Sequence, residues 1–128
     1  MRIDSLSQKR IIVEGRINGK PGSFLIDTGA SIGLIAKDRT KQYGLIQGRR
    51  YLGTLTGASG NEINARFMCD TQMELVGKPV SQFILSDISG IRESIRRETG
   101  YEILGIIGLS QMRTMGMRID TMDNHIEI

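Results

Sequence analysis

The stretch Phe24-Leu25-Ile26-Asp27-Thr28-Gly29-Ala30-Ser31 is the part of the chain from which its fold can be inferred. Three bulky apolar residues predict a strand that enters a buried core, and the small residues after them predict a sharp turn. Asp27 therefore lies where a carboxylate is poorly solvated, so it needs hydrogen-bond partners or a functional reason to be there. Thr28 offers a hydroxyl, and Gly29 lets another backbone segment approach closely. An ordinary turn with a satisfied aspartate is the structural alternative, because motifs of four letters recur by chance.

A second apolar segment, Ile103-Leu104-Gly105-Ile106-Ile107-Gly108, follows far downstream and leads into a short helical stretch. An apolar strand that ends in Asp-Thr-Gly-Ala, followed by an apolar-apolar-Gly segment before a short helix, resembles the retropepsin-like aspartic proteases. The resemblance implies a mostly β fold: a single-domain retropepsin-like acid-protease β-barrel with one or two short helices and a flap hairpin. The implied domain spans residues 1–128, and residues 1–9 would form a frayed arm or an edge strand.

The resemblance also implies roles for individual residues. Asp27 would be the catalytic acid/base that activates water. In the active-site turn, Thr28 would hydrogen-bond across a dimer, Gly29 would let two turns approach, and Ala30 would complete the motif. The positions implied to bind substrate or to pack beside the turn are the flap tip Gly57, Ala58, Ser59 and Gly60, and the second-motif residues Ile106, Ile107 and Gly108. Core packing remains the alternative for the two isoleucines, and an ordinary surface loop remains the alternative for the flap tip.

One aspartate motif implies two chains. Peptide hydrolysis by paired carboxylates needs one ionised acid to take a proton from water and one protonated acid to donate to the leaving amide. Asp-Thr-Gly occurs once in the 128 residues, so the second carboxylate would come from another copy across a two-fold axis. The expected function is a homodimeric aspartic endopeptidase acting on a peptide or protein substrate. The alternative is a catalytically weak or silent module of the same fold that dimerises or binds peptides.

Two positions depart from the retroviral pattern. Retroviral members carry an acid two residues beyond the motif glycine and an arginine directly after the second-motif glycine, and these brace the dimer. This chain has Ser31 and Leu109 there. The sequence is therefore interpreted as nearer to cellular, bacterial or phage members of the family.

The amino-acid composition narrows the remaining classes of protein and function. Hydrophobic residues make up 39% of the chain and charged residues 24%, as in ordinary globular proteins, and sixteen glycines favour a fold with many tight turns. The net charge of +3 is spread over pairs such as Arg49-Arg50 and Arg96-Arg97 without interleaved aromatic residues, which argues against nucleic-acid binding. Cys69 and His125 are the only residues of their types, so we expect no disulfide, no cofactor and no metal. No signal peptide or membrane span is visible, and we expect a cytoplasmic protein.

Hydrophobic periodicity and turn residues predict the elements. Asn18-Gly19 is the strongest hairpin signal, and it joins a strand over 10–17 to the strand that ends at Asp27. The other expected elements are a strand near 32–35, a helix over 37–43 stopped by Gly44, a hairpin with arms 49–55 and 61–69, a turn at 77–79 followed by a strand over 80–85, helices over 90–98 and 109–115, and a final hairpin with arms 117–120 and 125–128.

Overall fold

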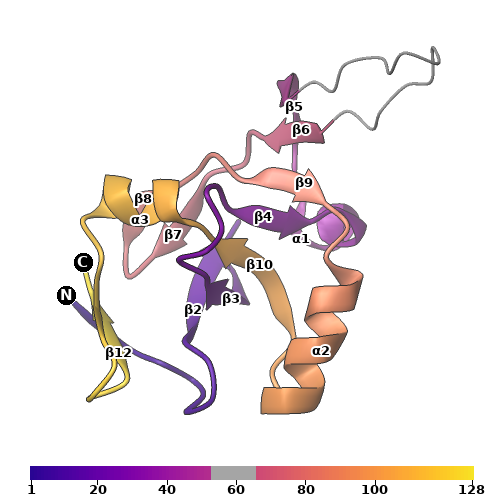
Figure 1. Ribbon diagram of the computed structural model, residues 1–128. Helices are drawn as coiled ribbons and strands as arrows, with labels where there is room; N and C mark the ends of the chain where they lie inside the picture. Colours follow the sequence, from indigo (N-terminus) through magenta and orange to yellow (C-terminus); the bar gives the residue numbers. More distant parts are fainter. Residues whose placement is uncertain (53–65) are drawn as a thin grey trace, which may run out of the picture.

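The computed structural model describes residues 1–52 and 66–128. Its strands are β1 (Arg2–Asp4), β2 (Ile12–Ile17), β3 (Lys20–Ile26), β4 (Leu34–Ala36), β5 (Gln47–Leu52), β6 (Arg66–Cys69), β7 (Met73–Leu75), β8 (Lys78–Val80), β9 (Ile84–Ser86), β10 (Ile103–Ile107), β11 (Arg118–Asp120) and β12 (His125–Glu127). Its helices are the 3₁₀ turn η1 (Lys37–Arg39) and the α-helices α1 (Thr40–Tyr43), α2 (Ser89–Thr99) and α3 (Leu109–Met115). The expected mostly β fold with short helices is confirmed (Figure 1).

The described strands form two sheets. The larger has the order β5-β6-β9-β4-β10-β3-β2-β7-β8, and the smaller has the order β1-β12-β11. Figure 1 shows α2 on one side of the molecule and the terminal strands on the other, with the two chain ends side by side. The N–H of Ile128 donates to the carbonyl of Met1 at 3.0 Å, and this bond fixes the two ends together. Residues 2–4 therefore form an edge strand, which was one of the two possibilities that the sequence left open.

The first hairpin forms as its sequence predicts. Ile17 pairs with Lys20 across a two-residue turn in which Asn18 and Gly19 both have positive φ, at 51° and 78°. This turn matches the twist of the flanking strands, and both residue types tolerate that conformation. In β2 the charged side chains of Glu14 and Arg16 are exposed between buried neighbours. The hairpin therefore gives β3 a fixed register before the chain reaches Asp27.

Strand β10 is the centre of the large sheet. It runs parallel to β3 and antiparallel to β4, and all five of its residues are buried. Ile107 pairs with Ile26, so β3 and β10 end together at the same edge of the sheet. In the core, the rings of Phe24 and Phe83 pack against each other with centroids 5.9 Å apart. Buried aromatic pairs of this kind add stability beyond the area they remove from water.

The expected turn at 77–79 and the strand over 80–85 were placed wrongly. The turn consists of Val76 and Gly77, both with positive φ, so Lys78 and Pro79 already belong to β8. Because Pro79 has no N–H to donate, it is tolerated in β8, which is an edge strand. The chain then breaks at Gln82, where φ is 68°, and β9 pairs with β4 and β6 instead.

Helix α2 extends one residue further at each end than the predicted 90–98, and its apolar face differs from the prediction. Oδ1 of Asp87 accepts the N–H of Ser89 at 2.9 Å, and Gly100 ends the helix in the left-handed conformation. Ile95 is buried, whereas Ile91 is 42% exposed and does not join the core. The helix is anchored by charge, because the Arg92 guanidinium binds both carboxylate oxygens of Asp38, just ahead of α1.

No helix within residues 1–52 and 66–128 combines the length and the apolar character that crossing a bilayer would require.

Arg92→Met should lower the free energy of unfolding by about 1 kcal/mol at pH 7, because it removes a charged hydrogen-bond pair that is partly open to solvent. The Arg92 guanidinium lowers the pKa of the Asp38 carboxyl. This pair therefore stabilises the fold above the ordinary aspartate pKa and ceases to do so as the pH falls through the lowered value. Urea denaturation of both proteins between pH 7 and pH 2 should show a deficit that shrinks toward acid. Arg113→Met, at an exposed position of α3, is the control, and an equal deficit for both variants at every pH would contradict the prediction.

Candidate active site

The loop 27–33 crosses the end of β10. It leaves β3 on one side of that strand and enters β4 on the other, as the sheet order β4-β10-β3 requires. The N–H of Asp27 donates to the carbonyl of Ile107 at 3.0 Å, which ties the start of the loop to the end of β10. The other end of the loop is fixed to β10 because Leu34, the first residue of β4, pairs with Ile106. The loop is therefore held at both ends by the strand it crosses.

The carboxylate of Asp27 is fixed by its own turn. Its Oδ1 accepts the N–H of Gly29 at 2.9 Å, and its backbone carbonyl accepts the N–H of Ala30 at 3.2 Å. In the described part of the chain, Oδ2 has no hydrogen-bond partner. Asp27 is half-buried, whereas Thr28 and Gly29 are exposed. The turn thus presents one carboxylate oxygen, with the hydroxyl of Thr28 on the same exposed turn.

Helix α3 holds the middle of the loop. The first N–H groups of an α-helix have no partner within the helix. Here the N–H of Leu109 donates to the carbonyl of Ala30 at 2.7 Å, and the N–H of Ser110 donates to the carbonyl of Ser31 at 3.1 Å. The second motif therefore supports the aspartate turn through backbone groups.

Gln111 is a supporting residue that the sequence reasoning missed. Its side chain is buried, and its Oε1 accepts the N–H of Gly33 at 2.9 Å and the N–H of Gly108 at 3.2 Å. Its Nε2 donates to the carbonyl of Gln82 at 3.0 Å. One amide thus joins the aspartate loop, the end of β10 and the segment before β9. A glutamine at the third position of a helix, where it accepts the N–H of the cap residue, is the signal that was available.

Two glycines permit this close crossing. A Cβ on Gly108 would lie 2.5 Å from the carbonyl carbon of Ile32, and a Cβ on Gly33 would lie 2.5 Å from the carbonyl oxygen of Ile106. Both contacts are with backbone atoms, which cannot rotate away. Gly108 therefore packs directly against the aspartate loop.

The other candidate residues are placed as follows. Ile106 and Ile107 are 3% and 0% exposed, which fits the core-packing alternative, and their contact with a substrate stays a prediction. Strands β5 and β6 form the base of the expected flap hairpin, with Tyr51 paired to Phe67. The flap-tip residues 57–60 lie outside the described residues. The described chain thus brings Asp27, its turn and Gly108 together.

Chemically, the described site is one carboxylate on a rigid turn. Within residues 1–52 and 66–128 no second carboxylate is hydrogen-bonded to Asp27. A single carboxyl group acts as an acid or as a base, but it does not fill both roles in one step. A paired-acid reaction therefore needs a second group from outside this site.

Comparison with known proteins shows the family and the fold of the chain. A family model described as aspartyl protease matches residues 13–110, and the chain belongs to that family. The retroviral protease-like domain of Ddi1 from Leishmania major is similar in structure, with a TM-score of 0.59 and 20% identity over 93% of this chain and 87% of that chain. The EIAV protease complexed with the inhibitor HBY-793 gives a TM-score of 0.54 and 19% identity over 87% of this chain and 92% of that chain.

A bacterial structure is also similar. The retropepsin-like aspartic protease from Rickettsia conorii gives a TM-score of 0.55 and 17% identity over 98% of this chain and 86% of that chain. At such identities the likeness shows the fold alone. The resemblance to retropepsin-like aspartic proteases inferred from the two motifs is confirmed.

Gly108→Ala should lower the free energy of unfolding by about 3 kcal/mol, because the new methyl group would force two backbone segments apart. Urea denaturation measures the loss. Gly90→Ala is the matched control: nothing lies within 4 Å of a Cβ at that helical position, so it should leave stability unchanged or raise it by about 0.5–1 kcal/mol. A Gly108→Ala protein as stable as the control would show that the crossing is not tight.

Gln111→Glu should destabilise the protein by about 2 kcal/mol at pH 7 and by less at pH 4. The acceptor for Gly33 and Gly108 is kept, but an ionised oxygen replaces the Nε2 donor and faces the carbonyl of Gln82. A protonated carboxyl can donate there, so the pKa of the introduced group is raised by folding and the stability deficit grows as the pH rises. The same change at the exposed Gln42, Gln42→Glu, should have little effect. Denaturation curves at both pH values test this, and a deficit that is independent of pH would refute the role of the amide.

Proposed function

We propose that the protein is an aspartic endopeptidase that is active as a homodimer, with Asp27 of each chain forming the catalytic pair. The observation that carries the proposal is the geometry of Asp27. It is the one acid of the Asp-Thr-Gly motif, it lies on a loop held at both ends by β10, and it presents an oxygen without a partner in the described chain. Membership of the aspartyl protease family supports the reaction class.

The mechanism follows from two carboxyl groups in close contact. Two aspartates about 3 Å apart do not both ionise, so they share one proton and titrate as a unit, as is general for aspartic proteases. The ionised Asp27 takes a proton from water, which attacks the peptide carbonyl carbon. The protonated Asp27 of the other copy gives its proton to the leaving amine as the C–N bond breaks. The products are a carboxylic acid and an amine, and no cofactor enters the reaction.

The exposed turn supports the expected assembly. A two-fold axis beside Asp27 would bring two identical turns together, and such an interface uses the same surface on both copies. Thr28 and Gly29 are exposed in the single chain, so they are accessible to a second copy. In this proposal the Thr28 hydroxyl of each chain hydrogen-bonds to the opposite turn, and the absence of a side chain on Gly29 permits the approach. A peptide would bind across the pair in an extended conformation, beneath the hairpin that β5 and β6 begin.

Asp27→Asn should abolish peptide cleavage without unfolding the protein. The asparagine Oδ1 can still accept the N–H of Gly29, so the turn keeps its hydrogen bond. An amide, however, cannot serve as the ionised base. Wild type and variant are assayed against a mixed peptide library from about pH 3 to pH 8, with and without a pepstatin-like inhibitor. Equal cleavage by both proteins would remove Asp27 from the mechanism.

Mixing the two proteins tests the shared pair directly. If subunits exchange, an equal amount of Asp27→Asn protein should reduce the activity of a fixed amount of wild type to about half, because mixed dimers contain one functional acid. Arg113→Gln, at an exposed position of α3, keeps Asp27, so adding an equal amount of it should about double the activity of the wild type alone. Full activity of a species that sediments as a monomer would overturn the dimer. A stable dimer without cleavage at any pH would favour the alternative of a silent dimerisation or peptide-binding module.

A further inference from the structure

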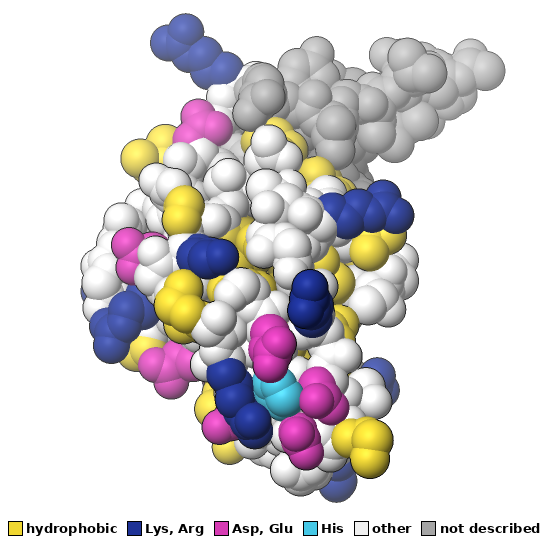
Figure 2. All heavy atoms as spheres, turned by 90° about the vertical axis from the view of Figure 1, so that its left-hand side faces the viewer, with side chains coloured by type: hydrophobic (Ala, Val, Ile, Leu, Met, Phe, Trp, Pro, Cys, Tyr) yellow, Lys and Arg dark blue, Asp and Glu magenta, His cyan; other side chains and the backbone are white. Residues whose placement is uncertain are grey.

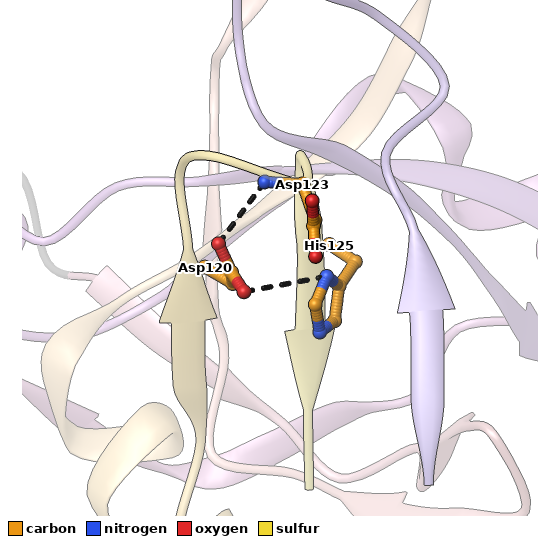
Figure 3. Close-up of side chains that lie close together, drawn as sticks. All are labelled: Asp120, Asp123 and His125. Atoms are coloured by element: carbon orange, nitrogen blue, oxygen red, sulfur yellow. Dashed lines mark hydrogen bonds and ion pairs between the residues drawn. The ribbon is translucent and has the colours of Figure 1, made fainter.

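Three potential metal ligands gather at the C-terminal hairpin, away from the aspartate turn. Asp120 ends β11, Asp123 lies in the connecting turn, and His125 begins β12. One ligand atom from each residue lies within 4.8 Å of the others. Figure 3 shows the imidazole turned toward Asp120, with the carboxylate of Asp123 beside it. In the space-filling view of Figure 2, acidic side chains lie above and to the right of the histidine, and a basic side chain lies on its left.

The imidazole of His125 has one nitrogen without a partner. Its side chain is 4% exposed, and Nε2 lies 3.2 Å from Oε1 of Glu127. Nδ1 is buried and makes no hydrogen bond to the described part of the chain. The closest carboxylate oxygen, Oδ2 of Asp120, is 3.9 Å away, which is too far for a hydrogen bond. A buried polar atom without a partner is costly, so the site needs something more than the side chains shown.

The tautomer of His125 indicates which kind of group would complete the site. A neutral imidazole carries one N–H. If Nε2–H donates to Glu127, then Nδ1 holds a lone pair, and this lone pair points toward two carboxylates. Electron pairs on all three groups repel one another unless a positive charge lies between them. The arrangement therefore calls for a cation.

The carboxylates are ready to bind such a cation. Oδ1 of Asp120 accepts the N–H groups of Met122 and Asp123, each at 3.0 Å, and this leaves Oδ2 turned toward His125. These backbone hydrogen bonds, that of Asp123 first, lower the pKa of Asp120, so it is ionised at neutral pH. The nearby guanidinium of Arg2 is already bound to Asp4, with its Nε 2.9 Å from Oδ1. Arg2 also acts on Asp120 and Asp123 through its charge, but its side-chain hydrogen bond in the described chain goes to Asp4.

We propose that Asp120, Asp123 and His125 bind a divalent transition-metal ion, with Zn²⁺ as the preferred ion, through Nδ1 of His125 and one oxygen of each aspartate. Imidazole nitrogen with carboxylate oxygen is a donor set that suits Zn²⁺, whereas Mg²⁺ and Ca²⁺ prefer oxygen alone. Glu127 holds the other ring nitrogen, as the outer carboxylate does in many histidine–metal sites. Asp123 is exposed, so its side chain can turn inward by the small distance that coordination requires, and water completes the coordination shell.

The bound ion would join the hairpin turn to β12, the central strand of the small sheet. This sheet also fixes the two chain ends. The proposal rests on the C-terminal hairpin alone and does not depend on proteolysis by Asp27.

The chain offers an unusually clear test because His125 is its only histidine. In tag-free, chelator-treated full-length protein, the ¹⁵N resonances of the imidazole report on one residue. Addition of Zn²⁺ should shift the Nδ1 resonance and leave Nε2 protonated. Calorimetry should give one ion per chain, and Tm should rise with Zn²⁺ concentration, as expected when a ligand binds the folded state.

Two variants separate binding from folding. Asp123→Asn replaces an exposed side chain, keeps the fold, and should weaken Zn²⁺ binding at least 10-fold. His125→Ala should abolish binding. Glu74→Gln, which removes an exposed carboxylate from β7, is the control and should bind Zn²⁺ like the wild type. If Zn²⁺ leaves the Nδ1 resonance unchanged while a proton resides on that nitrogen at neutral pH, the cation is a proton and the proposal is wrong. Binding that survives in Asp123→Asn but is lost in Cys69→Ser would also overturn it.

Discussion

The structure depends on one crossing of the backbone: the loop 27–33 passes over the end of β10 within van der Waals contact. Neither Gly108 nor Gly33 could carry a methyl group without displacing backbone atoms of the opposite segment. Close contact buries peptide groups, and each of these must be paired. The amide of Gln111 and the first N–H groups of α3 pair with them. The rigidity of the Asp27 turn is therefore a result of how the crossing satisfies its hydrogen bonds.

The elements that sequence predicts well here are those whose cause is local. Asn18-Gly19 makes its hairpin, and Gly44, Gly100 and Gly116 end α1, α2 and α3 in the left-handed conformation, because each choice is made within a few residues. The misplaced elements were decided by distant partners. Gln111 contacts Gly33 across 78 positions of sequence, and Gln82 takes a positive φ where its carbonyl accepts from the same side chain. In α2 the two apolar positions differ: Ile95 packs into the core, whereas Ile91 stays exposed.

The departures from the retroviral pattern are compatible with the aspartate turn for a physical reason. At Leu109 and Ser31 it is the backbone that acts: the N–H of Leu109 binds the loop at Ala30, and the carbonyl of Ser31 receives the N–H of Ser110. Backbone hydrogen bonds do not depend on side-chain identity, so the turn keeps its support without an ion pair. What the sequence could not supply is the interface of the proposed dimer, because an interface depends on the shape of a surface rather than on a motif.

The two aspartate sites of this chain share a feature that links fold to function. At Asp27 the turn satisfies Oδ1 and leaves Oδ2 without a partner in the described chain; at the C-terminal hairpin the turn satisfies Oδ1 of Asp120 and leaves Oδ2 near the bare Nδ1 of His125. In both sites, backbone N–H groups of a short turn donate to one carboxylate oxygen, and this holds the other oxygen in place. A carboxylate oxygen that is held in place by its turn and has no partner in the described chain is available to another group. In the proposed dimer, the group at Asp27 would be the matching acid with its shared proton; at His125 the proposed group is a metal ion, because of these two sites it is the one in which a buried nitrogen lone pair lies beside the carboxylates.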